Sequence, residues 1–560
     1  MTPCDVWPAW AALCAGALLL AAALWRRHLT HFSRRGVPYA RPLPLVGNML
    51  QMTLGKKAIP DVVAELYNKL DPHPYAGVFN FTMPLLMIRD PEIIRAITVK
   101  DFDHFTDHVG FETNSKKANP LLKKMLFALK GKEWHDMRAT LSPAFTSMKM
   151  KNMFVLMTEI GQQLVDYLLT ETGDGEGKTL TLEMKDFFTR VTNDIIATTA
   201  FGIKVDSLSD PGNQFYRMGR RLTSVRPLVG VGYMMSPRLM EVRVPSGCLP
   251  PGVVWVCPGE TLSGTNTALF YHVLQLLGIP FFDPKTVGFF RTMVSDTIET
   301  REKQGIVRHD MIHLLMQSRK GELSSPDGEK NGVSETKGRA LSEDDIAAQA
   351  MLFFFGGFDT VATLLMFLSY LLATHEEVQR RLQEDIDGLM QSSKGQPSYE
   401  QVMGCQYLDM VISETLRMHT PGAVLDRKCV RRYKLPPTEH CPGFEIQPGE
   451  GVWVPVHGIH HDPRNYEHPG RFDPERFSPE NRHLIKPFTY YPFGSGPRVC
   501  IAQRFALMET KVVVTHLLSR FSFCVVEKTP LPLVIQPNNL SLGIKGGAWV
   551  GIRRRSSALV

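Results

Sequence analysis

One long apolar segment near the middle of the chain constrains the fold more than any other feature. Residues 342–375 read SEDDIAAQAMLFFFGGFDTVATLLMFLSYLLATH. Ser342 can cap a helix here, with Asp345 as the reciprocal acceptor. Because this helix is apolar nearly all round, we expect it to be buried through the centre of a domain. Shorter runs at 80–91 and 444–456 are typical of strands with turns, so the predicted fold class is mainly α with minor β.

The N-terminus predicts a membrane anchor. The twenty residues Val6–Trp25 carry no charge, and as a helix they would span about 30 Å, the thickness of the hydrocarbon core of a membrane. Four arginines follow within ten residues: Arg26, Arg27, Arg34 and Arg35. By the positive-inside rule this places the rest of the chain in the cytosol. The alternative is a cleaved signal peptide, which normally carries its positive charge before the apolar run.

The chain divides into three predicted parts. Residues 1–25 form the anchor, residues 26–48 a basic and proline-rich linker, and residues 49–560 a single body. Within this body, residues 241–275 hold four prolines and four glycines and show no sustained period. A structureless segment of this length is uncommon inside a compact domain. We interpret it as an insertion, such as a retained intron or a gene-model error; a lid or partner loop is the alternative.

Composition excludes several classes of protein. A formal net charge of +7 is mild for 560 residues, and no basic–aromatic repeat indicates nucleic-acid binding. The nine cysteines are scattered and contain no C-x-x-C pair. A disulfide framework or a zinc ribbon is therefore not expected, and a reducing compartment fits better.

A cysteine near the C-terminus has the surroundings of a metal-binding thiolate. In FGSGPRVCIAQRF, residues 493–505, Gly494 and Gly496 permit a tight turn with inward N–H groups. Helical periodicity follows Cys500, and Arg498 adds a nearby cation. A free cysteine is more often a small buried hydrophobe. These features together instead indicate a held sulfur anion, and cysteine thiolate is a standard axial ligand of haem iron.

This stretch resembles the haem-binding motif of the cytochrome P-450 family. The matching residues are Phe493, Gly494, Gly496, Arg498 and Cys500. Ala502 departs from the motif, because the family more often has glycine there. The resemblance implies the cytochrome P-450 fold, haem b (iron protoporphyrin IX) as cofactor, and Cys500 as its axial thiolate.

Two further motifs, ETLR and PERF, contain Glu414, Arg417 and Arg476. Glu414 and Arg417 lie on one helical face, and taken alone they could form an ordinary surface ion pair. The resemblance implies instead that the three residues form a buried charged cluster that braces the cysteine segment. Their predicted role is structural support.

The GGFDT motif, residues 356–360, lies inside the long apolar helix. Two helical glycines cost about 1 kcal/mol each, so a compensating role is expected. Close helix packing is one explanation. The resemblance implies a break that forms a groove for dioxygen and water, with Asp359 and Thr360 as the catalytic acid–alcohol pair. Thr360 would hydrogen-bond bound dioxygen, and Asp359 would deliver protons through water.

The remaining cofactor contacts come from WHDMR and LDRK. Trp134 and Arg138 lie on one helical face, and the resemblance implies that they contact a haem propionate. Arg427 and Arg498 are the other implied propionate partners, because arginine pairs well with carboxylates. Three histidines at 456–463 could suggest a separate metal site, but their neighbours match the family's usual approach to PERF.

The resemblance covers the chain from about Pro38 to residue 550, apart from 241–275, and is closest to insect microsomal forms that metabolise drugs and toxins. It implies a monooxygenase on the cytosolic face of the endoplasmic reticulum. Electrons would come from NADPH–cytochrome P-450 reductase, with cytochrome b5 as a further donor. Apolar substrates are expected, xenobiotics before hormones or fatty acids. The predicted pocket lining is Phe353, Phe354, Phe355 and residues near 105–125 and 420–425.

Two alternatives to a monooxygenase remain at this point. An isomerase or dehydratase of the same family would need neither dioxygen nor reductase, although the Asp359–Thr360 pair argues against it. A non-catalytic haem-binding protein would result if the insertion disabled the substrate channel. Separately, the basic stretch leading to Arg138 includes Lys130 and Lys132, which could steer an acidic redox partner or simply form a solvated face.

Overall fold

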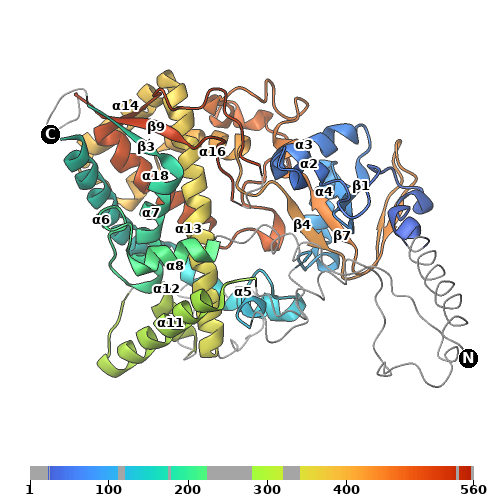
Figure 1. Ribbon diagram of the computed structural model, residues 1–560, viewed down its shortest axis with the longest axis horizontal. Coiled ribbons are helices and arrows are strands. Elements are labelled where there is room, and N and C mark those ends of the chain that lie inside the picture. The colour runs from blue at the N-terminus through green and yellow to red at the C-terminus, as the bar shows by residue number, and fades with distance from the viewer. Residues whose placement is uncertain are drawn as a thin grey trace, which may run out of the picture.

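The computed structural model describes residues 23, 25–110, 120–173, 178–223, 281–308, 310–319, 341–537 and 541–556. The predicted insertion, and all but two residues of the predicted anchor, lie outside this part of the chain. The described part is mainly helical with minor sheet, as the sequence predicts. A four-stranded sheet lies at one end of the molecule, and most of the long helices lie at the other end together with a second, three-stranded sheet (Figure 1).

The helices vary from single turns to one of more than thirty residues. They are α2 (Leu50–Thr53), α3 (Ile59–Lys69), α4 (Pro91–Arg95), α5 (Gly131–Leu141), α6 (Ser147–Thr172), α7 (Met184–Ile196), α8 (Gln214–Thr223), α11 (Pro284–Gln304), α12 (Met311–Arg319), α13 (Glu343–Thr374), α14 (Glu376–Ser392), α15 (Tyr399–Met403), α16 (Gln406–Met418), α17 (Val456–His460) and α18 (Gln503–Arg520). Short 3-10 or π turns include η1 (Ser33–Arg35), η6 (Ala197–Phe201), η7 (Pro474–Phe477) and η9 (Gly496–Arg498).

Three small sheets complete the described fold. The first has the order β1 (Tyr75–Asn80), β2 (Met83–Ile88), β7 (Gly451–Val454) and β4 (Leu425–Lys428), with β2 and β7 parallel. The second has the order β3 (Thr179–Glu183), β9 (Trp549–Arg554) and β8 (Phe521–Cys524), and the third pairs β5 (Tyr433–Leu435) with β6 (Phe444–Ile446). The run at 444–456 therefore supplies strands to two different sheets.

The predicted central helix is α13. The Ser342 hydroxyl accepts the backbone N–H of Asp345, and the Asp345 carboxylate returns to the Ser342 backbone, which confirms the predicted capping box. The helix runs through the helical half of the molecule, and Figure 1 shows it in yellow crossing the centre. Among the described residues, α13 alone is long and apolar enough to cross a membrane, but its apolar window is mostly buried inside the protein. It is a core helix.

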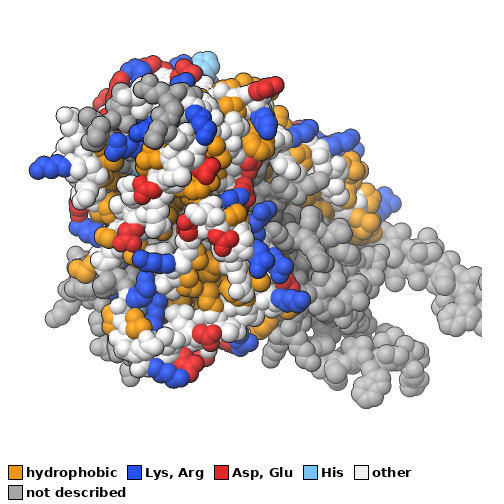
Figure 2. Space-filling view, turned by 60° about the vertical axis from the view of Figure 1, so that its left-hand side comes forward, with side chains coloured by type: hydrophobic (Ala, Val, Ile, Leu, Met, Phe, Trp, Pro, Cys, Tyr) orange, Lys and Arg blue, Asp and Glu red, His pale blue; other side chains and the backbone are white. Residues whose placement is uncertain are grey.

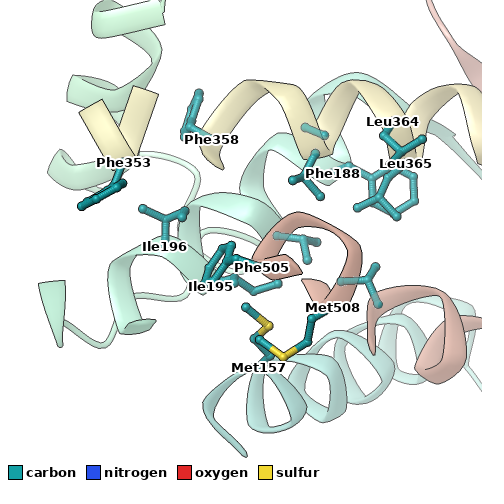
Figure 3. Close-up of a cluster of buried hydrophobic side chains, with 14 of the residues drawn as sticks. Met157, Phe188, Ile195, Ile196, Phe353, Phe358, Leu364, Leu365, Phe505 and Met508 are labelled. Carbon is teal, nitrogen blue, oxygen red and sulfur yellow. The ribbon is translucent and has the colours of Figure 1, made fainter. Parts of the chain in front are cut away.

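Two buried apolar clusters make up the core. The larger one joins α13 to α7, α6 and α18, and Figure 3 shows side chains from these elements, including Phe188, Ile195, Leu364 and Met508, packed together. The smaller cluster lies around the four-stranded sheet. On the helical face, Lys, Arg, Asp and Glu side chains are interspersed (Figure 2), in keeping with the mild net charge.

Candidate active site

A cavity of about 420 Å³ lies at the boundary between the two core clusters. This volume is within the usual range for small-molecule and cofactor sites. Its walls are mostly apolar and come from α5, η6, α13, the segment before β4 and the segment before α18. The residues that bear on function are Trp134, Arg138, Thr199, Phe353, Gly356, Thr360, Pro421, Gly422, Val424, Leu425, Phe493, Arg498 and Cys500.

Cys500 opens directly onto this cavity. Its side chain is exposed, although protein atoms surround it on the other sides, because the accessible space is the cavity itself. The turn before it is fixed by a hydrogen bond from the Cys500 backbone N–H to the Phe493 carbonyl, at 2.9 Å. Gly496 has a φ of +70°, and a Cβ there would lie 1.7 Å from the Thr98 carbonyl oxygen. Only glycine fits that position.

Burial raises the pKa of the Cys500 thiol, while the Ala502 backbone N–H and Arg138 oppose the shift. The helix α18 begins at Gln503, so the cysteine precedes the helix and does not sit in its first turn. The helix dipole therefore gives less help than the sequence suggested. To remain a thiolate, the Cys500 sulfur needs a strong cation, such as a metal ion, directly beside it.

Arg498 is a buried cation on the cavity wall. Its Nε donates to the Thr106 carbonyl at 2.7 Å and its Nη2 to the Leu129 carbonyl at 2.9 Å. Its guanidinium carbon lies 4.0 Å from the centre of the Trp134 ring. Burial lowers the pKa of Arg498 to about 9, partly offset by Asp107, whose carboxylate is 3.9 Å away. A buried guanidinium with only a distant carboxylate is suited to an anionic ligand.

Arg427 lies behind the same wall, although its side chain does not line the cavity. It is 1% exposed, and its Nη2 donates to the Ser495 carbonyl at 3.0 Å. Its Nε has no hydrogen-bond partner among the described residues. Burial lowers the pKa of Arg427 to about 10. A buried orphan donor on a cation indicates that a partner belongs beside it.

Trp134 and Arg138 lie one turn apart on α5, as predicted, and both line the cavity. The Arg138 Nη1 donates to the Val499 carbonyl at 2.8 Å, next to the cysteine. Trp134, Arg138 and Arg498 line an apolar space that has the Cys500 thiol on its wall, and Arg427 lies behind that wall. That combination fits haem, which has an apolar macrocycle, two carboxylates and an iron that accepts an axial thiolate.

The wall formed by α13 differs from the prediction in one respect. The helix is continuous across the two glycines, so the predicted interruption is wrong. A Cβ on Gly357 would lie 2.4 Å from Cδ1 of Ile196, so this glycine permits close packing of α7. Gly356 has no atom near the place of a Cβ and faces the open cavity. The Thr360 hydroxyl donates to the Gly356 carbonyl at 2.6 Å and lines the same space.

Asp359 does not line the cavity. Its Oδ1 lies 2.8 Å from Nζ of Lys185 on α7 and accepts a hydrogen bond of 2.8 Å from the Ser541 hydroxyl. Lys185 also donates to the hydroxyl of Thr363, one turn along α13. No sequence motif predicted Lys185 or Ser541, because both contacts join segments that are far apart in the chain.

Of the three phenylalanines predicted to line the pocket, only Phe353 does so. Phe354 is fully buried in the other direction, where its ring lies against those of Phe290 and Phe358. Phe355 lies near Phe282. Successive residues on a helix point about 100° apart, so three in a row cannot share one wall. In the predicted ranges 105–125 and 420–425, His108 and four residues from Pro421 to Leu425 line the cavity, and residues 111–119 lie outside the described part of the chain.

Glu414, Arg417 and Arg476 lie together. The Arg417 guanidinium donates to both Glu414 oxygens at 2.7 and 2.9 Å, and Nε of Arg476 is 3.4 Å from Oε1. Glu414 and Arg417 are fully buried. The Asp473 backbone N–H also donates to Glu414, at 3.0 Å. This cluster fastens α16 to η7.

His460 connects this cluster to the cysteine segment. Its Nδ1 lies 3.1 Å from the Arg417 carbonyl, and its Nε2 accepts the backbone N–H of Tyr491 at 2.9 Å. Burial lowers the pKa of His460 to about 3, so the ring is neutral and can accept at Nε2. Within the described residues, no three His, Cys, Asp or Glu side chains are grouped as a metal site. The histidine-rich stretch contributes hydrogen bonds to the fold.

Comparison with known proteins agrees with this site. The family model described as Cytochrome P450 matches residues 37–240 and 282–549. The chain is 44% identical over 541 residues to cytochrome P450 9e2 of Blattella germanica, covering 94% of each chain. It is 37% identical over 549 residues to probable cytochrome P450 9f2 of Drosophila melanogaster, covering 96% of this chain and 98% of the relative. Cytochrome P450 6k1 of Blattella germanica is 34% identical over 551 residues, 96% of each chain.

These matches confirm the predicted resemblance to insect forms. Together with a cavity that presents the Cys500 sulfur, Arg138 and the buried Arg498, they show that the chain belongs to the cytochrome P450 family of haem-thiolate monooxygenases.

Proposed function

We propose that this chain is a membrane-anchored monooxygenase that oxidises apolar small molecules, with foreign compounds as the preferred substrate class. The observation that carries the proposal is one apolar cavity that has Cys500 on one wall and Thr360 of α13 on another. Haem, when bound here, supplies the chemistry that inserts one oxygen atom of O2 into a substrate and reduces the other to water, and the thiolate favours O–O cleavage.

Six residues would hold the cofactor. Cys500 would provide the axial sulfur, and Phe493 would pack beside it. Arg427, Arg498, Arg138 and Trp134 would bind the two carboxylates, which would give the orphan Nε of Arg427 a partner. The anions would also offset the burial that lowers the pKa of Arg498 to about 9.

Asp359 and Thr360 would divide the handling of protons between two sides of α13. Thr360 faces the cavity, where its hydroxyl can hold or pass a proton to a bound ligand. Asp359 faces Lys185 and Ser541, and its side chain is partly exposed. A carboxylate at the outer side, next to an alcohol at the inner side, can relay protons inward through water. The Lys185 contact must loosen for Asp359 to take part.

Residues 1–25 would anchor the enzyme in the endoplasmic reticulum with residues 26–560 on the cytosolic face. The uncharged run from Val6 to Trp25 and the four arginines that follow support this placement. NADPH–cytochrome P450 reductase would supply electrons, with cytochrome b5 as a further donor. Removal of residues 1–25 should release the protein from membranes into an alkaline carbonate extract; retention there would contradict the anchor.

Residues 241–275 would be an insertion that adds nothing to catalysis. The family model passes over residues 241–281, and this supports the proposal. Expression of the full chain beside a chain that lacks 241–275 tests it. Equal turnover in the two would support a neutral insertion. Turnover only in the full chain would contradict it and favour a functional loop.

Turnover in membranes tests the function itself. The full chain, reductase, NADPH and O2 should convert an alkoxycoumarin to its fluorescent hydroxycoumarin, and omission of any one component should abolish the product. Rearrangement of a lipid hydroperoxide without O2 or reductase would contradict the proposal and favour the isomerase alternative.

A further inference from the structure

A second cavity lies beside the four-stranded sheet, and Cys500 is not among the residues that line it. Its volume is about 430 Å³. One wall is the first described segment of the chain, which supplies Arg27, His28, His31, Arg34 and Arg35, and the other walls are Met83, Pro84, Val109, Gly110, Lys428, Gly449, Glu450 and Gly451. Four cationic side chains thus face one carboxylate. Figure 1 shows this N-terminal segment, in dark blue, at the end of the molecule that holds the four-stranded sheet.

The wall is firmly attached to the sheet. Phe32 is 2% exposed and packs on Gly77 of β1, where a Cβ would lie 2.2 Å from the ring. His28 is also buried, and its Nε2 lies 2.6 Å from the Thr82 carbonyl oxygen. Because these two contacts fix the segment, the arginines that it carries have defined positions over the cavity.

The charges in this cavity are not balanced. Glu450 is bound by Arg35, and its Oε1 lies 3.2 Å from Nε2 of His31. Burial opposes ionisation of Glu450, but the hydrogen bonds from His31 and Arg35 leave its pKa below the usual value. The single carboxylate is therefore ionised and already paired. Among the described residues, none offers a carboxylate to Arg27 or Arg34, and both arginines are exposed.

The cavity also has an apolar part, formed by Met83, Pro84 and Val109. A water molecule takes up about 30 Å³ in the liquid, so 430 Å³ is far more than a lone phosphate group needs. A ligand with a phosphate and a short apolar portion would use both parts. The wall directly follows the uncharged run that ends at Trp25, so the proposed anchor would bring this end of the molecule to a membrane surface.

We propose that this cavity binds the headgroup of an anionic phospholipid, with Arg27 and Arg34 pairing with the phosphate. The choice of a lipid over a soluble phosphate rests on the membrane anchor proposed above. The site is separate from the haem cavity and needs neither haem nor turnover.

The test is calorimetric titration of the full chain, in neutral detergent, with dihexanoyl phosphatidic acid below its critical micelle concentration. Dihexanoyl phosphatidylcholine and inorganic phosphate are the comparison ligands. The variant Arg27→Gln/Arg34→Gln removes the two proposed contacts. The control Arg26→Gln/Arg41→Gln makes the same change in charge at two exposed arginines that do not line the cavity.

We expect phosphatidic acid to bind more tightly than either comparison ligand. The first variant should weaken that binding about 25-fold, since each cation near an anionic headgroup contributes a factor of about five. The control variant should change the affinity for phosphatidic acid less than twofold.

Equal binding of phosphatidylcholine, or of inorganic phosphate, would overturn the assignment of an anionic lipid. An equal loss of affinity in both variants would overturn the assignment of the site. A near-ultraviolet circular dichroism spectrum of each variant checks that it is folded. If the double variant does not fold, Arg34→Gln alone replaces it, and we expect this single change to weaken phosphatidic acid binding about fivefold.

Discussion

Nζ of Lys185 on α7 lies 2.8 Å from Oδ1 of Asp359 on α13, and the Asp359 side chain does not line the haem cavity. Thr360, the next residue, faces the cavity. The acid and the alcohol of the pair therefore lie on different sides of one helix. The proposed proton path therefore leads from Asp359 on the outer side of α13 to Thr360 in the cavity.

Asp359→Asn keeps the shape of the side chain and its contact with Ser541 but removes the charge. We expect product formation at saturating substrate to fall about 100-fold, in the usual range for a lost proton carrier, with an increased solvent deuterium isotope effect. Haem content should not change, because the side chain does not line the cavity. Asp344→Asn is the matched control, since Asp344 is an ion-paired aspartate at the start of the same helix. Unchanged turnover and isotope effect in Asp359→Asn would exclude a role in proton delivery.

Glu414 is the shared acceptor of Arg417, Arg476 and the Asp473 backbone N–H. Glu414→Gln leaves the fully buried Arg417 without its carboxylate, and breaking a buried pair in this way costs about 3–5 kcal/mol. The midpoint of urea unfolding should fall accordingly. Glu377→Gln removes an exposed carboxylate that pairs with Arg380 and should have little effect. A small effect at Glu414, equal to that at Glu377, would show that the cluster does not stabilise the fold.

Glu509 on α18 is fully buried, and neither of its oxygens has a hydrogen-bond partner among the described residues. Burial raises its pKa well above the usual value. Its carboxyl group therefore stays protonated in the folded state while the unfolded chain ionises. The contribution of this protonated group to the free energy of unfolding is therefore fully present only below about pH 4.5, where the unfolded chain is protonated too. That contribution is lost as the pH rises toward the folded-state pKa of Glu509.

Glu509→Gln should remove that pH dependence. Between pH 5.5 and 7.5, the stability of the wild type relative to the variant should fall, by at most about 1.4 kcal/mol per pH unit. Urea unfolding followed by tryptophan fluorescence at the two pH values measures the difference. Glu480→Gln, at an exposed position, should have the same stability to urea as the wild type at both pH values. A constant difference between wild type and Glu509→Gln would mean that Glu509 is ionised in the folded protein.

Lys130 and Lys132 are exposed at the start of α5, the helix that carries Trp134 and Arg138 toward the cavity. If they steer the reductase, Lys130→Glu/Lys132→Glu should slow reductase-driven turnover about tenfold at low salt and much less at high salt. Peroxide-driven turnover should not change. Lys285→Glu/Lys303→Glu, on exposed positions of α11, is the control. Equal losses in the reductase and peroxide assays would exclude a docking role.

The parts of the site that the sequence predicted come from short motifs. A local turn, closed by the hydrogen bond from the Cys500 backbone N–H to the Phe493 carbonyl, places Cys500, and a single helical turn places Trp134 beside Arg138. The cap at Ser342 is equally local. Such features depend on neighbouring residues, so they can be predicted without knowledge of the rest of the fold.

The features that the sequence did not predict depend on contacts between distant segments. The GGFDT motif was predicted to break α13, but the helix continues through it, and Gly357 is needed because Ile196 of α7 fills the space that a side chain would take. Phe354 faces Phe290 of α11 and not the cavity, and Asp359 meets Lys185 of α7. The surroundings of Gly357, Phe354 and Asp359 all depend on which helix packs against each face of α13.

The most direct test of the central claim is the reduced, carbon-monoxide-bound absorption spectrum of the full chain beside Cys500→His and Cys429→Ser. Cys500 opens onto the cavity, whereas Cys429 is buried near the sheet. We expect the strongly red-shifted band of thiolate ligation in the wild type and in Cys429→Ser, and its loss in Cys500→His. Retention of that band in Cys500→His, or its absence from the wild type, would contradict the assignment of Cys500 as the haem ligand.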